Sequence, residues 1–321
     1  MFPIEWLTQA NDRLRSFVTH TPITYDGDHH LLIKWESYQI TGSFKVRGAL
    51  NRVFNLQDWE VKHGLVTTSA GNHGQGLAYA GKIARVPVKV FVPENASKLK
   101  VERIQALGAT VGHVPGDYGR AERAGKQYAE EHGVTWVSPY NDSLVIAGQS
   151  TVAQEVILDF PEAIEATWIV PIGGGGLISG IAVYLASLTA KPRIIGVQAE
   201  ASPFFYHLQR WGSQTGAVDL PTLADGLAGA VEAGSITIPI VGRYVEDIVL
   251  VSEQELVDAV RYAWEFYGEP IEPSGAAGLA AALSGKIDTR PSVVIVTGGN
   301  ISAAAHLALI NSQINAAYTT V

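Results

Sequence analysis

A lysine set among small residues is the first candidate for chemistry in this chain. Lys45 directly follows Ser43 and Phe44 in the run TGSFKVRGA, whereas most lysines lie on charged helix faces. A partly apolar pocket disfavours the ammonium form and lowers the pKa of a lysine. A neutral lysine amine forms Schiff bases with aldehydes. The motif is short and also fits a structural lysine, so Lys45 is a hypothesis that other segments must support.

A polar turn is the second candidate. Ser69, Gly71, Asn72 and His73 lie in the sequence SAGNHGQG, between a β-branched run and an alanine-rich helical pattern. Glycine lets the backbone approach a ligand closely, and the free N–H groups at a helix start bind carboxylates or phosphates. The turn therefore predicts a substrate-binding site at these four residues, although Ser69 and Asn72 would serve equally well as helix caps.

Four consecutive glycines form the third candidate. Gly173, Gly174, Gly175 and Gly176 follow an apolar run and precede Leu177, which opens a helical pattern. Such a run loses much backbone entropy on folding, which is understandable if its bare N–H groups wrap an anion. No Lys-Ser/Thr pair follows, and no dinucleotide fingerprint is present. The loop predicts a site for the phosphate of a compact cofactor, with a flexible hinge as the alternative.

The fourth candidate is a hydroxyl residue at the end of a buried-type strand. Thr297 closes the run VVIVT and precedes Gly298, Gly299 and Asn300. In open α/β sheets, ligands bind outside the carboxyl ends of the strands. The position suits a site residue, while a plain strand-to-helix turn explains the segment equally well.

Together these segments resemble the fold-type II pyridoxal-phosphate enzymes, specifically the serine/threonine dehydratase and serine racemase family. The resemblance extends from about Pro22 to Asn300 and includes the stretch Ile271–Gly275. It implies roles for the candidate residues. Lys45, beside Phe44, would carry the cofactor as a Schiff base, Asn72 would bond its ring hydroxyl, Gly173, Gly174, Gly175, Gly176 and Leu177 would hold its phosphate, and Thr297 would face the pyridine nitrogen.

The fold expectation has two sources. Short apolar strands, such as residues 110–114, alternate with helical patterns, such as residues 98–106, 149–160 and 253–267. This alternation predicts βαβ units and largely parallel sheets. The resemblance implies an α/β fold with two open, twisted, mostly parallel sheets flanked by helices. It also implies a large cofactor-binding domain of residues 1–48 and 146–321, and a small inserted domain of residues 49–145. A C-terminal regulatory module is not expected after the last cofactor segment.

Composition narrows the class of protein. The 321 residues are 47% hydrophobic and 17% charged, which suffices for a large core. The formal net charge of -8, without a dense basic run, argues against nucleic acid as a partner. There is no cysteine, which excludes disulfides and thiolate chemistry. No apolar run reaches membrane-spanning length. We expect a cytoplasmic enzyme without membrane contact, forming a homo-oligomer, either a dimer or a tetramer.

The resemblance implies a reaction. Pyridoxal phosphate would support β-elimination from L-threonine or L-serine, giving 2-oxobutanoate or pyruvate and ammonia. Lys45, once released, is the nearest base for the Cα proton. A hydroxyl at Thr297 can only hydrogen-bond a mostly neutral ring nitrogen, which favours prompt loss of a β-leaving group. Serine racemases of the family have a serine where this chain has Ala70, so efficient racemisation is not expected.

A divalent cation is left open. Glu200 follows a predicted strand at the place where members of the family often bind a cation. The next acidic ligand is expected about six residues later, where this chain has Tyr206, with Asp225 as a candidate outer partner. Hard cations require several oxygen ligands, so no metal site is assigned.

Several alternatives remain. A 3-hydroxyaspartate dehydratase would need a group such as Arg120 for the extra carboxylate, although this residue also fits a charged helix face. A serine racemase of the same fold is a second alternative. A cysteine synthase is disfavoured, because its usual lysine motif and Thr-Ser-Gly-Asn-Thr loop are absent. A catalytically silent protein that binds pyridoxal phosphate is the non-enzyme alternative. The preference among threonine, serine and hydroxyaspartate does not follow from the sequence.

Overall fold

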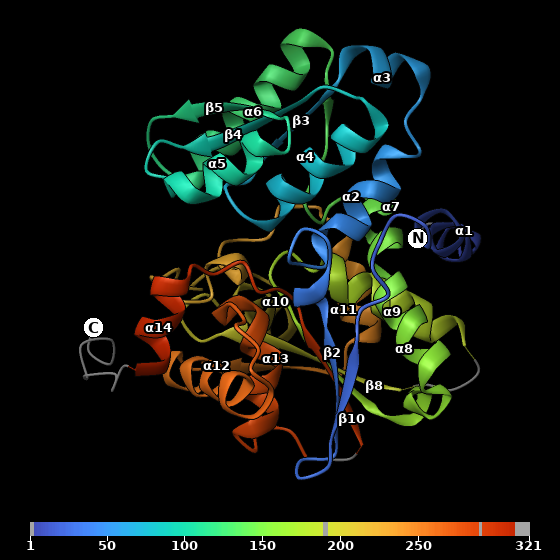
Figure 1. Cartoon of the computed structure of the whole chain (residues 1–321), viewed down its shortest axis with the longest axis vertical. Helices are drawn as coiled ribbons and strands as arrows, with labels where there is room; N and C mark the ends of the chain where they lie inside the picture. Colours follow the sequence, from blue (N-terminus) through green and yellow to red (C-terminus); the bar gives the residue numbers. More distant parts are fainter. Residues whose placement is uncertain (1–2, 189–191, 289–290, 312–321) are drawn as a thin grey trace.

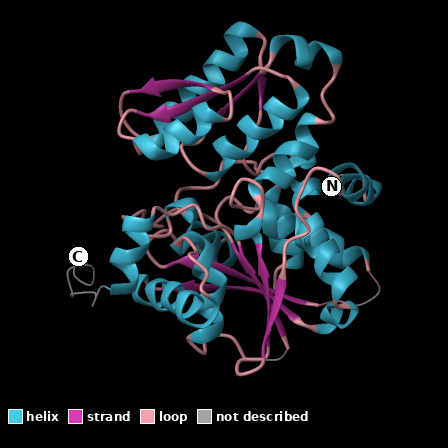
Figure 2. Cartoon of the chain, viewed as in Figure 1, coloured by secondary structure: helices cyan, strands magenta, loops and turns pink. Residues whose placement is uncertain are grey.

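Two separate sheets organise the chain, which a computed structural model describes over residues 3–188, 192–288 and 291–311 (Figure 1). Helices flank both sheets (Figure 2). The strands are β1 (Ile23–Asp26), β2 (Leu31–Trp35), β3 (Leu65–Thr68), β4 (Val88–Pro93), β5 (Thr110–Val114), β6 (Thr135–Trp136), β7 (Thr167–Pro171), β8 (Arg193–Ala199), β9 (Asp247–Val251) and β10 (Ser292–Val296). The α-helices are α1 (Glu5–Leu14), α2 (Lys45–Val53), α3 (Asp58–His63), α4 (Asn72–Ala84), α5 (Lys98–Ala106), α6 (Tyr118–His132), α7 (Ser143–Gln149), α8 (Thr151–Asp159), α9 (Gly176–Ser187), α10 (Phe204–Trp211), α11 (Thr237–Tyr244), α12 (Glu253–Tyr267), α13 (Pro273–Leu283) and α14 (Ala303–Asn311).

Most strand pairs are parallel. The larger sheet has the order β1-β2-β10-β7-β8-β9, in which β1 and β2 are antiparallel and the other neighbours are parallel. The smaller sheet, β5-β4-β3-β6, is parallel throughout. Parallel strands need crossover connections, which the flanking helices provide. The predicted α/β fold with two mostly parallel sheets is confirmed.

The strand order of the larger sheet explains where the candidate residues meet. Strands β2, β10 and β7 are neighbours, although they are far apart in the sequence. Because they are parallel, their carboxyl ends share one edge of the sheet. The segment leading to Lys45 leaves β2, Thr297 follows β10, and the glycine loop follows β7. The polar turn at Ser69 leaves the carboxyl end of β3 in the smaller sheet.

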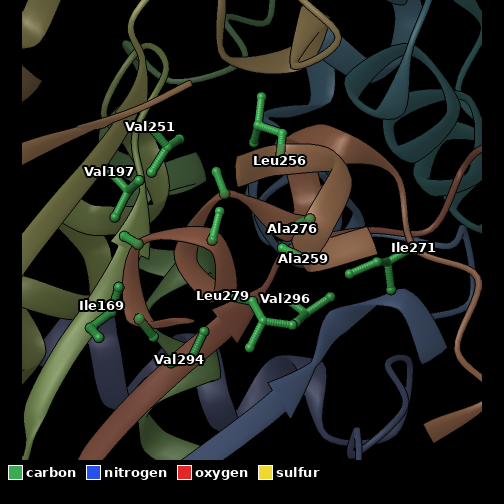
Figure 3. Packing of buried hydrophobic residues seen from close by; sticks show 14 of the residues in the cluster. Ile169, Val197, Val251, Leu256, Ala259, Ile271, Ala276, Leu279, Val294 and Val296 are labelled. Carbon is green, nitrogen blue, oxygen red and sulfur yellow. The ribbon is translucent and has the colours of Figure 1, made fainter. Parts of the chain in front are cut away.

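A hydrophobic core holds the larger sheet against helices α12 and α13. Figure 3 shows Ala276 and Leu279 of α13 among valine and isoleucine side chains of the strands. Both helix residues are fully buried. Small alanine side chains let α13 approach the sheet closely, and each large core side chain buried contributes about 2 kcal/mol. The core therefore fixes the position of α13, whose first residues reach the candidate site.

The domain division stays a proposal. The smaller sheet and helices α3 to α6 fall inside residues 49–145 and form the upper part of the molecule in Figure 1. A boundary between residues 48 and 49 would fall within α2, which packs against both α4 and α7. We propose that α2 is the element shared by the two domains.

The surface of the described chain shows no membrane-spanning feature. Within residues 3–188, 192–288 and 291–311, no helix combines the length and the apolar character that crossing a bilayer requires. Several large apolar side chains are nevertheless exposed, among them Leu158, Trp211 and Phe266.

Candidate active site

Helix α2 begins at Lys45, at a point where the segment after β2 meets the end of β10. The backbone N–H of Phe44 donates to the Thr297 carbonyl at 3.2 Å, and Ser43 forms an antiparallel bridge with Gly298. These backbone contacts join two segments separated by some 250 residues. They place Lys45 beside the predicted nitrogen-binding residue Thr297.

The Lys45 amine lies in a mostly uncharged environment. Its Nζ donates to the Pro139 carbonyl oxygen at 3.3 Å and lies 5.1 Å from the centroid of the Phe44 ring. Burial alone lowers the pKa of Lys45 to about 8, since no neighbouring carboxylate in the described part of the chain holds its charge. A substantial fraction of the amine is therefore neutral slightly above neutral pH, as Schiff-base formation requires.

A buried charge cluster anchors α2 two residues after Lys45. Arg47 donates to Glu36 at 2.7 Å and to Glu155 at 2.6 Å, and Lys34 lies 2.6 Å from Glu155. The side chains of Arg47, Lys34 and Glu36 are 0% exposed. Two cations balance two carboxylates, and removing one partner of such a buried group typically costs 3–5 kcal/mol, roughly. The cluster fixes the start of α2, and with it the backbone of Lys45.

The glycine loop has no room for side chains. A Cβ on Gly174 would lie 2.2 Å from Cδ1 of Tyr140, and one on Gly176 would lie 3.0 Å from Cα of the same tyrosine. Gly175, the N-cap of α9, has a φ of +85°, which favours glycine. Leu177, the second residue of α9, is buried in the core. The loop thus presents bare backbone N–H groups at a helix start, which is a setting for a phosphate.

Thr297 lies at the carboxyl end of β10 with its hydroxyl loosely held. Its Oγ1 is 3.5 Å from the Ser274 carbonyl oxygen, a long distance for an O–H···O bond. Its backbone N–H donates to the Gly275 carbonyl at 3.3 Å. The side chain is buried and uncharged, so it can exchange a hydrogen bond with a ring nitrogen but cannot keep that nitrogen protonated.

Asn72 belongs to a hydrogen-bonded group at the start of α4. Its Nδ2 donates to Oε1 of Glu272 at 2.6 Å, and its Oδ1 accepts from Nδ2 of Asn300 at 2.7 Å. Burial raises the pKa of Glu272 to about 7, against the effect of the Asn72 hydrogen bond. Asp225 raises this pKa further, while Lys100 and Arg103 lower it.

The polar turn is ordered largely by its own contacts. Ser69 Oγ accepts the Gly71 N–H at 3.1 Å, and His73 Nε2 lies 3.2 Å from the Val137 carbonyl oxygen. Burial, together with the nearby Lys45 charge, lowers the pKa of His73 to about 3, so its imidazole is neutral at physiological pH. The predicted contacts of Ser69, Gly71, Asn72 and His73 with a substrate carboxylate stay predictions.

The three residues considered for a cation site each contact a different partner. Glu200 Oε1 lies 3.6 Å from Lys286, and Asp225 pairs with Lys100 at 2.8 Å. Tyr206 interacts through its backbone N–H with Gln198. Among the residues that the structure describes, no three His, Cys, Asp or Glu side chains gather in a way that could hold a metal ion. We therefore assign no cation site.

Comparison with known proteins gives the family. A family model described as pyridoxal-phosphate dependent enzyme matches residues 16–298, most of the chain. The chain belongs to this enzyme family. The L-threonine ammonia-lyase of Thermotoga maritima is 36% identical over 94% of this chain and 76% of its own length. The L-threo-3-hydroxyaspartate ammonia-lyase of a Pseudomonas species is 36% identical over 94% of this chain and 96% of its own.

Comparison with a solved structure supports the same family. Maize serine racemase is 33% identical and superposes with a TM-score of 0.86, covering 94% of this chain and 94% of its own. The predicted family, its pyridoxal-phosphate cofactor and its fold are confirmed. The lyase class predicted for the chain is also that of the relatives named above.

The arrangement of this chain fits the cofactor of the family. The glycine loop packs against Tyr140 so closely that Gly174 cannot accept a Cβ. Pro139, the residue before Tyr140, accepts a hydrogen bond from the Lys45 amine. The Lys45 amine and the glycine loop thus both adjoin the segment Pro139–Tyr140, which suits a small molecule that carries both an aldehyde and a phosphate.

Two residues of the site had no role in the sequence analysis. Glu272 and Asn300 both contact Asn72, and both lie in segments already singled out by their motifs. A glutamate directly before Pro-Ser-Gly in an apolar stretch is a signal for a buried carboxyl group. The sequence offered no means of pairing it with a residue 200 positions earlier.

Proposed function

We propose that this protein removes water from L-threonine or L-serine and releases 2-oxobutanoate or pyruvate together with ammonia. The observation that carries the proposal is the buried Lys45 amine, with its pKa lowered to about 8, which bonds Pro139 next to the Tyr140 that packs on the glycine loop. The named relatives at 36% identity include an L-threonine ammonia-lyase, which supports the substrate class.

The chain's own residues have distinct tasks in this proposal. When bound, pyridoxal phosphate withdraws electrons from the substrate Cα and makes its proton acidic. The Lys45 amine, once free, accepts that proton. Helix α4 binds the substrate carboxylate through the N–H groups of its first turn, from Gly71 to His73. Gly173, Gly174, Gly175, Gly176 and Leu177 hold the phosphate, Asn72 bonds the ring hydroxyl, and Thr297 hydrogen-bonds the ring nitrogen without charging it.

A second candidate is the dehydration of 3-hydroxyaspartate. It is supported by the relative of that activity, which is as similar to this chain as the threonine enzyme. The extra carboxylate needs a cation, and Arg120 in the first turn of α6 is exposed with no side-chain ion pair within the described residues. Its backbone N–H donates to Oδ1 of Asp117 at 2.9 Å, which fixes the residue in the first turn of the helix.

A keto-acid assay over a panel of substrates tests both candidates. Purified protein loaded with pyridoxal phosphate is given L-threonine, L-serine and L-threo-3-hydroxyaspartate, and keto acid and ammonia are measured. We expect the two neutral substrates to react. Preference for 3-hydroxyaspartate, lost on Arg120→Ala but kept on Arg123→Ala, would instead establish the second candidate. No keto acid from any of the three would refute both.

The proposal also includes the oligomeric state and the cellular location of the protein. We propose a cytoplasmic homo-oligomer, a dimer or a tetramer. Exposed aromatic side chains such as Trp211 on α10 and Phe266 on α12 support subunit contacts, because large exposed apolar groups favour burial in an interface. Light scattering of the purified chain measures its mass, and a monomer at micromolar concentration would contradict this part of the proposal.

A further inference from the structure

We propose that Glu272 and Asn300 are positioning residues that fix the Asn72 amide so that it offers only an N–H group to the ring oxygen of the cofactor. This inference rests on the proposed contact between Asn72 and that ring oxygen. It adds the direction of the hydrogen bond, and hence the charge that the site favours on the ring.

The orientation of Asn300 follows from its three neighbours. Its Nδ2 is 2.7 Å from the Thr41 carbonyl oxygen and 2.7 Å from Oδ1 of Asn72. Its Oδ1 is 3.4 Å from Nη1 of Arg103, which can only donate. A flipped amide would set its oxygen against the Thr41 carbonyl oxygen, with no hydrogen between them. Asn300 is therefore a donor toward Asn72.

The orientation of Asn72 follows in turn. Because Asn300 donates, the group of Asn72 that faces it must be the carbonyl Oδ1. On the other side, Oε1 of Glu272 accepts from Nδ2 at 2.6 Å. One of the two Nδ2 hydrogens is used there, and no second acceptor for this group lies among the described residues. The free hydrogen is the group that remains for a ligand.

A donor in that place has a chemical consequence. A ring oxygen that receives an N–H bond is stabilised as an anion, whereas an amide oxygen in the same place would favour the protonated hydroxyl. Charge-assisted hydrogen bonds contribute more than neutral ones. The Asn72 orientation therefore sets the ionisation of the ring oxygen, and with it the visible absorption of the bound cofactor.

The charges around Glu272 do not reverse this orientation. Lys100 and Arg103 of α5 favour its carboxylate, while burial and Asp225 favour its acid form. In either form Oε1 keeps a lone pair toward Asn72, because a carboxylic acid retains its carbonyl oxygen. Asn72 therefore stays a donor across the pH range in which Glu272 titrates.

The hydrogen-bonded residues around Asn72 also connect the two parts of the molecule. Asn72 and Arg103 belong to α4 and α5 beside the smaller sheet, while Glu272 and Asn300 follow elements of the larger one. Figure 1 shows α4 and α5 in the upper part of the molecule and α13 in the lower part. The ring contact is thus oriented only when the two parts are together.

The test compares spectra and cofactor affinity of the loaded protein. Asn300→Asp replaces both donors by a carboxylate, which repels Oδ1 of Asn72 and removes the contact that, together with Glu272, fixes the Asn72 amide. We expect the visible band to weaken in favour of the near-ultraviolet form, and the Kd for pyridoxal phosphate to rise about tenfold or more. Glu272→Gln keeps an acceptor oxygen and should resemble the wild type. Asn11→Asp on α1 adds the same charge at a remote place and should change nothing.

The possible results separate this inference from the proposed function. If Asn72→Ala alters the band and the Kd while Asn300→Asp leaves both unchanged, the positioning role is wrong and the Asn72 contact stands. If Asn72→Ala changes neither, the proposed ring contact is wrong, and this inference falls with it. Should Asn300→Asp fail to fold by circular dichroism, Asn300→Ala removes the side-chain donors without adding charge. An unchanged band in Asn300→Ala would equally overturn the positioning role.

Discussion

Burial moves three titratable groups at the site toward their uncharged forms. It lowers the pKa of Lys45 to about 8 and, with the Lys45 charge, that of His73 to about 3, and it raises the pKa of Glu272 to about 7. The common cause is desolvation, which disfavours a charge of either sign. The lowered pKa of Lys45 favours the neutral, nucleophilic amine. Because His73 is neutral, the proposed carboxylate binding in the turn would depend on backbone N–H groups and Ser69.

The assignment of Lys45 leads to a chemical prediction. The wild-type protein loaded with pyridoxal phosphate and treated with borohydride should carry a reduced adduct on Lys45, identified by peptide mass. Lys45→Ala should carry none, because Lys45 is the lysine that we assign to this site among the described residues. Lys89→Ala, which removes a lysine of β4, serves as the control and should be labelled like the wild type. An adduct of wild-type yield on another lysine in Lys45→Ala would disprove the assignment.

The raised pKa of Glu272 predicts a pH dependence of stability. The native state keeps the Glu272 proton between about pH 4.5 and about 7, where the unfolded state has lost it. The native state therefore binds more protons, and this group lowers the free energy of unfolding as the pH rises through that window. Glu272→Gln removes the effect. Each unit of pKa difference corresponds to about 1.4 kcal/mol, so the variant should gain a few kcal/mol on the wild type between about pH 5 and about 8.

Urea denaturation of the cofactor-free protein at both pH values measures this difference. Glu102→Gln on α5 is the matched control, since it removes an exposed carboxylate that no buried group bonds. A constant difference between Glu272→Gln and the wild type at the two pH values would show that Glu272 titrates as an exposed glutamate does.

At the scale of elements, regular patterns were predicted well and context-dependent ones poorly. The predicted helices Lys98–Ala106 and Glu253–Tyr267 match α5 and α12 at both ends, and Thr110–Val114 matches β5. One predicted helix, Gln149–Phe160, was wrong at its start, because α7 ends at Gln149 and α8 begins at Thr151. Ser150 closes α7 by donating to the Ala147 carbonyl at 2.6 Å.

Other elements were missed for physical reasons. The short strands β1 and β2 flank the turn of residues 27–30. Strand β2 is largely buried, but it contains the charged residue Lys34, which is not typical of a buried strand. That lysine is neutralised by Glu155, 121 residues away. Pairings of this kind depend on tertiary contacts, which periodicity within one segment does not contain. The same limit applies to Glu272 and Asn300, which became part of the site only through Asn72.

The glycine loop leads to a prediction about cofactor retention. Gly174→Ala places a methyl group against the Tyr140 ring, 2.2 Å from its Cδ1, and must displace the tyrosine or the loop. We expect the Kd for pyridoxal phosphate to rise at least about tenfold, since one or more charge-assisted N–H bonds are lost. The loop lies at the surface of the site, so the melting temperature of the cofactor-free protein should change by only a few degrees.

Gly242→Ala is the matched control for this element. Gly242 lies inside α11, and a Cβ there would meet nothing within 4 Å. Alanine is the better helix former by about 1 kcal/mol, so this variant should be as stable as the wild type or more so, with normal cofactor affinity. Wild-type cofactor affinity in Gly174→Ala, despite the displaced Tyr140, would count against the phosphate role of the loop.

At the scale of the whole molecule, the site exists because two sheets contribute to it. The larger sheet supplies Lys45, Thr297 and the glycine loop from three neighbouring strand ends. The smaller sheet supplies the polar turn. Ion pairs also cross between the two parts, as in Lys100–Asp225 at 2.8 Å and Lys126–Glu232 at 2.7 Å. The polar turn and Lys45, for which we propose carboxylate binding and the Schiff base, thus come together only in the assembled chain.

The reaction type is a property of this whole arrangement and gives the last prediction. Racemisation requires acid–base groups on both faces of the substrate Cα, and Lys45 serves only one. Ala70 carries a methyl group in the polar turn, where a hydroxyl would be needed on the other face. From L-serine we expect pyruvate and ammonia, with D-serine formed at well under about a tenth of that rate, since one missing catalytic group typically lowers a rate ~10²-fold.

The variant Ala70→Ser should raise D-serine formation relative to pyruvate, because it supplies the missing proton donor without disturbing Lys45 or Thr297. Ala70→Gly is the control, since it changes the size of the side chain but adds no hydroxyl. Chiral chromatography of timed reactions measures both products from the same sample. Wild-type protein that formed D-serine as fast as pyruvate would contradict the prediction. It would require a second base on the turn side of the substrate, and His73, neutral and directed at Val137, would then be the residue to replace first.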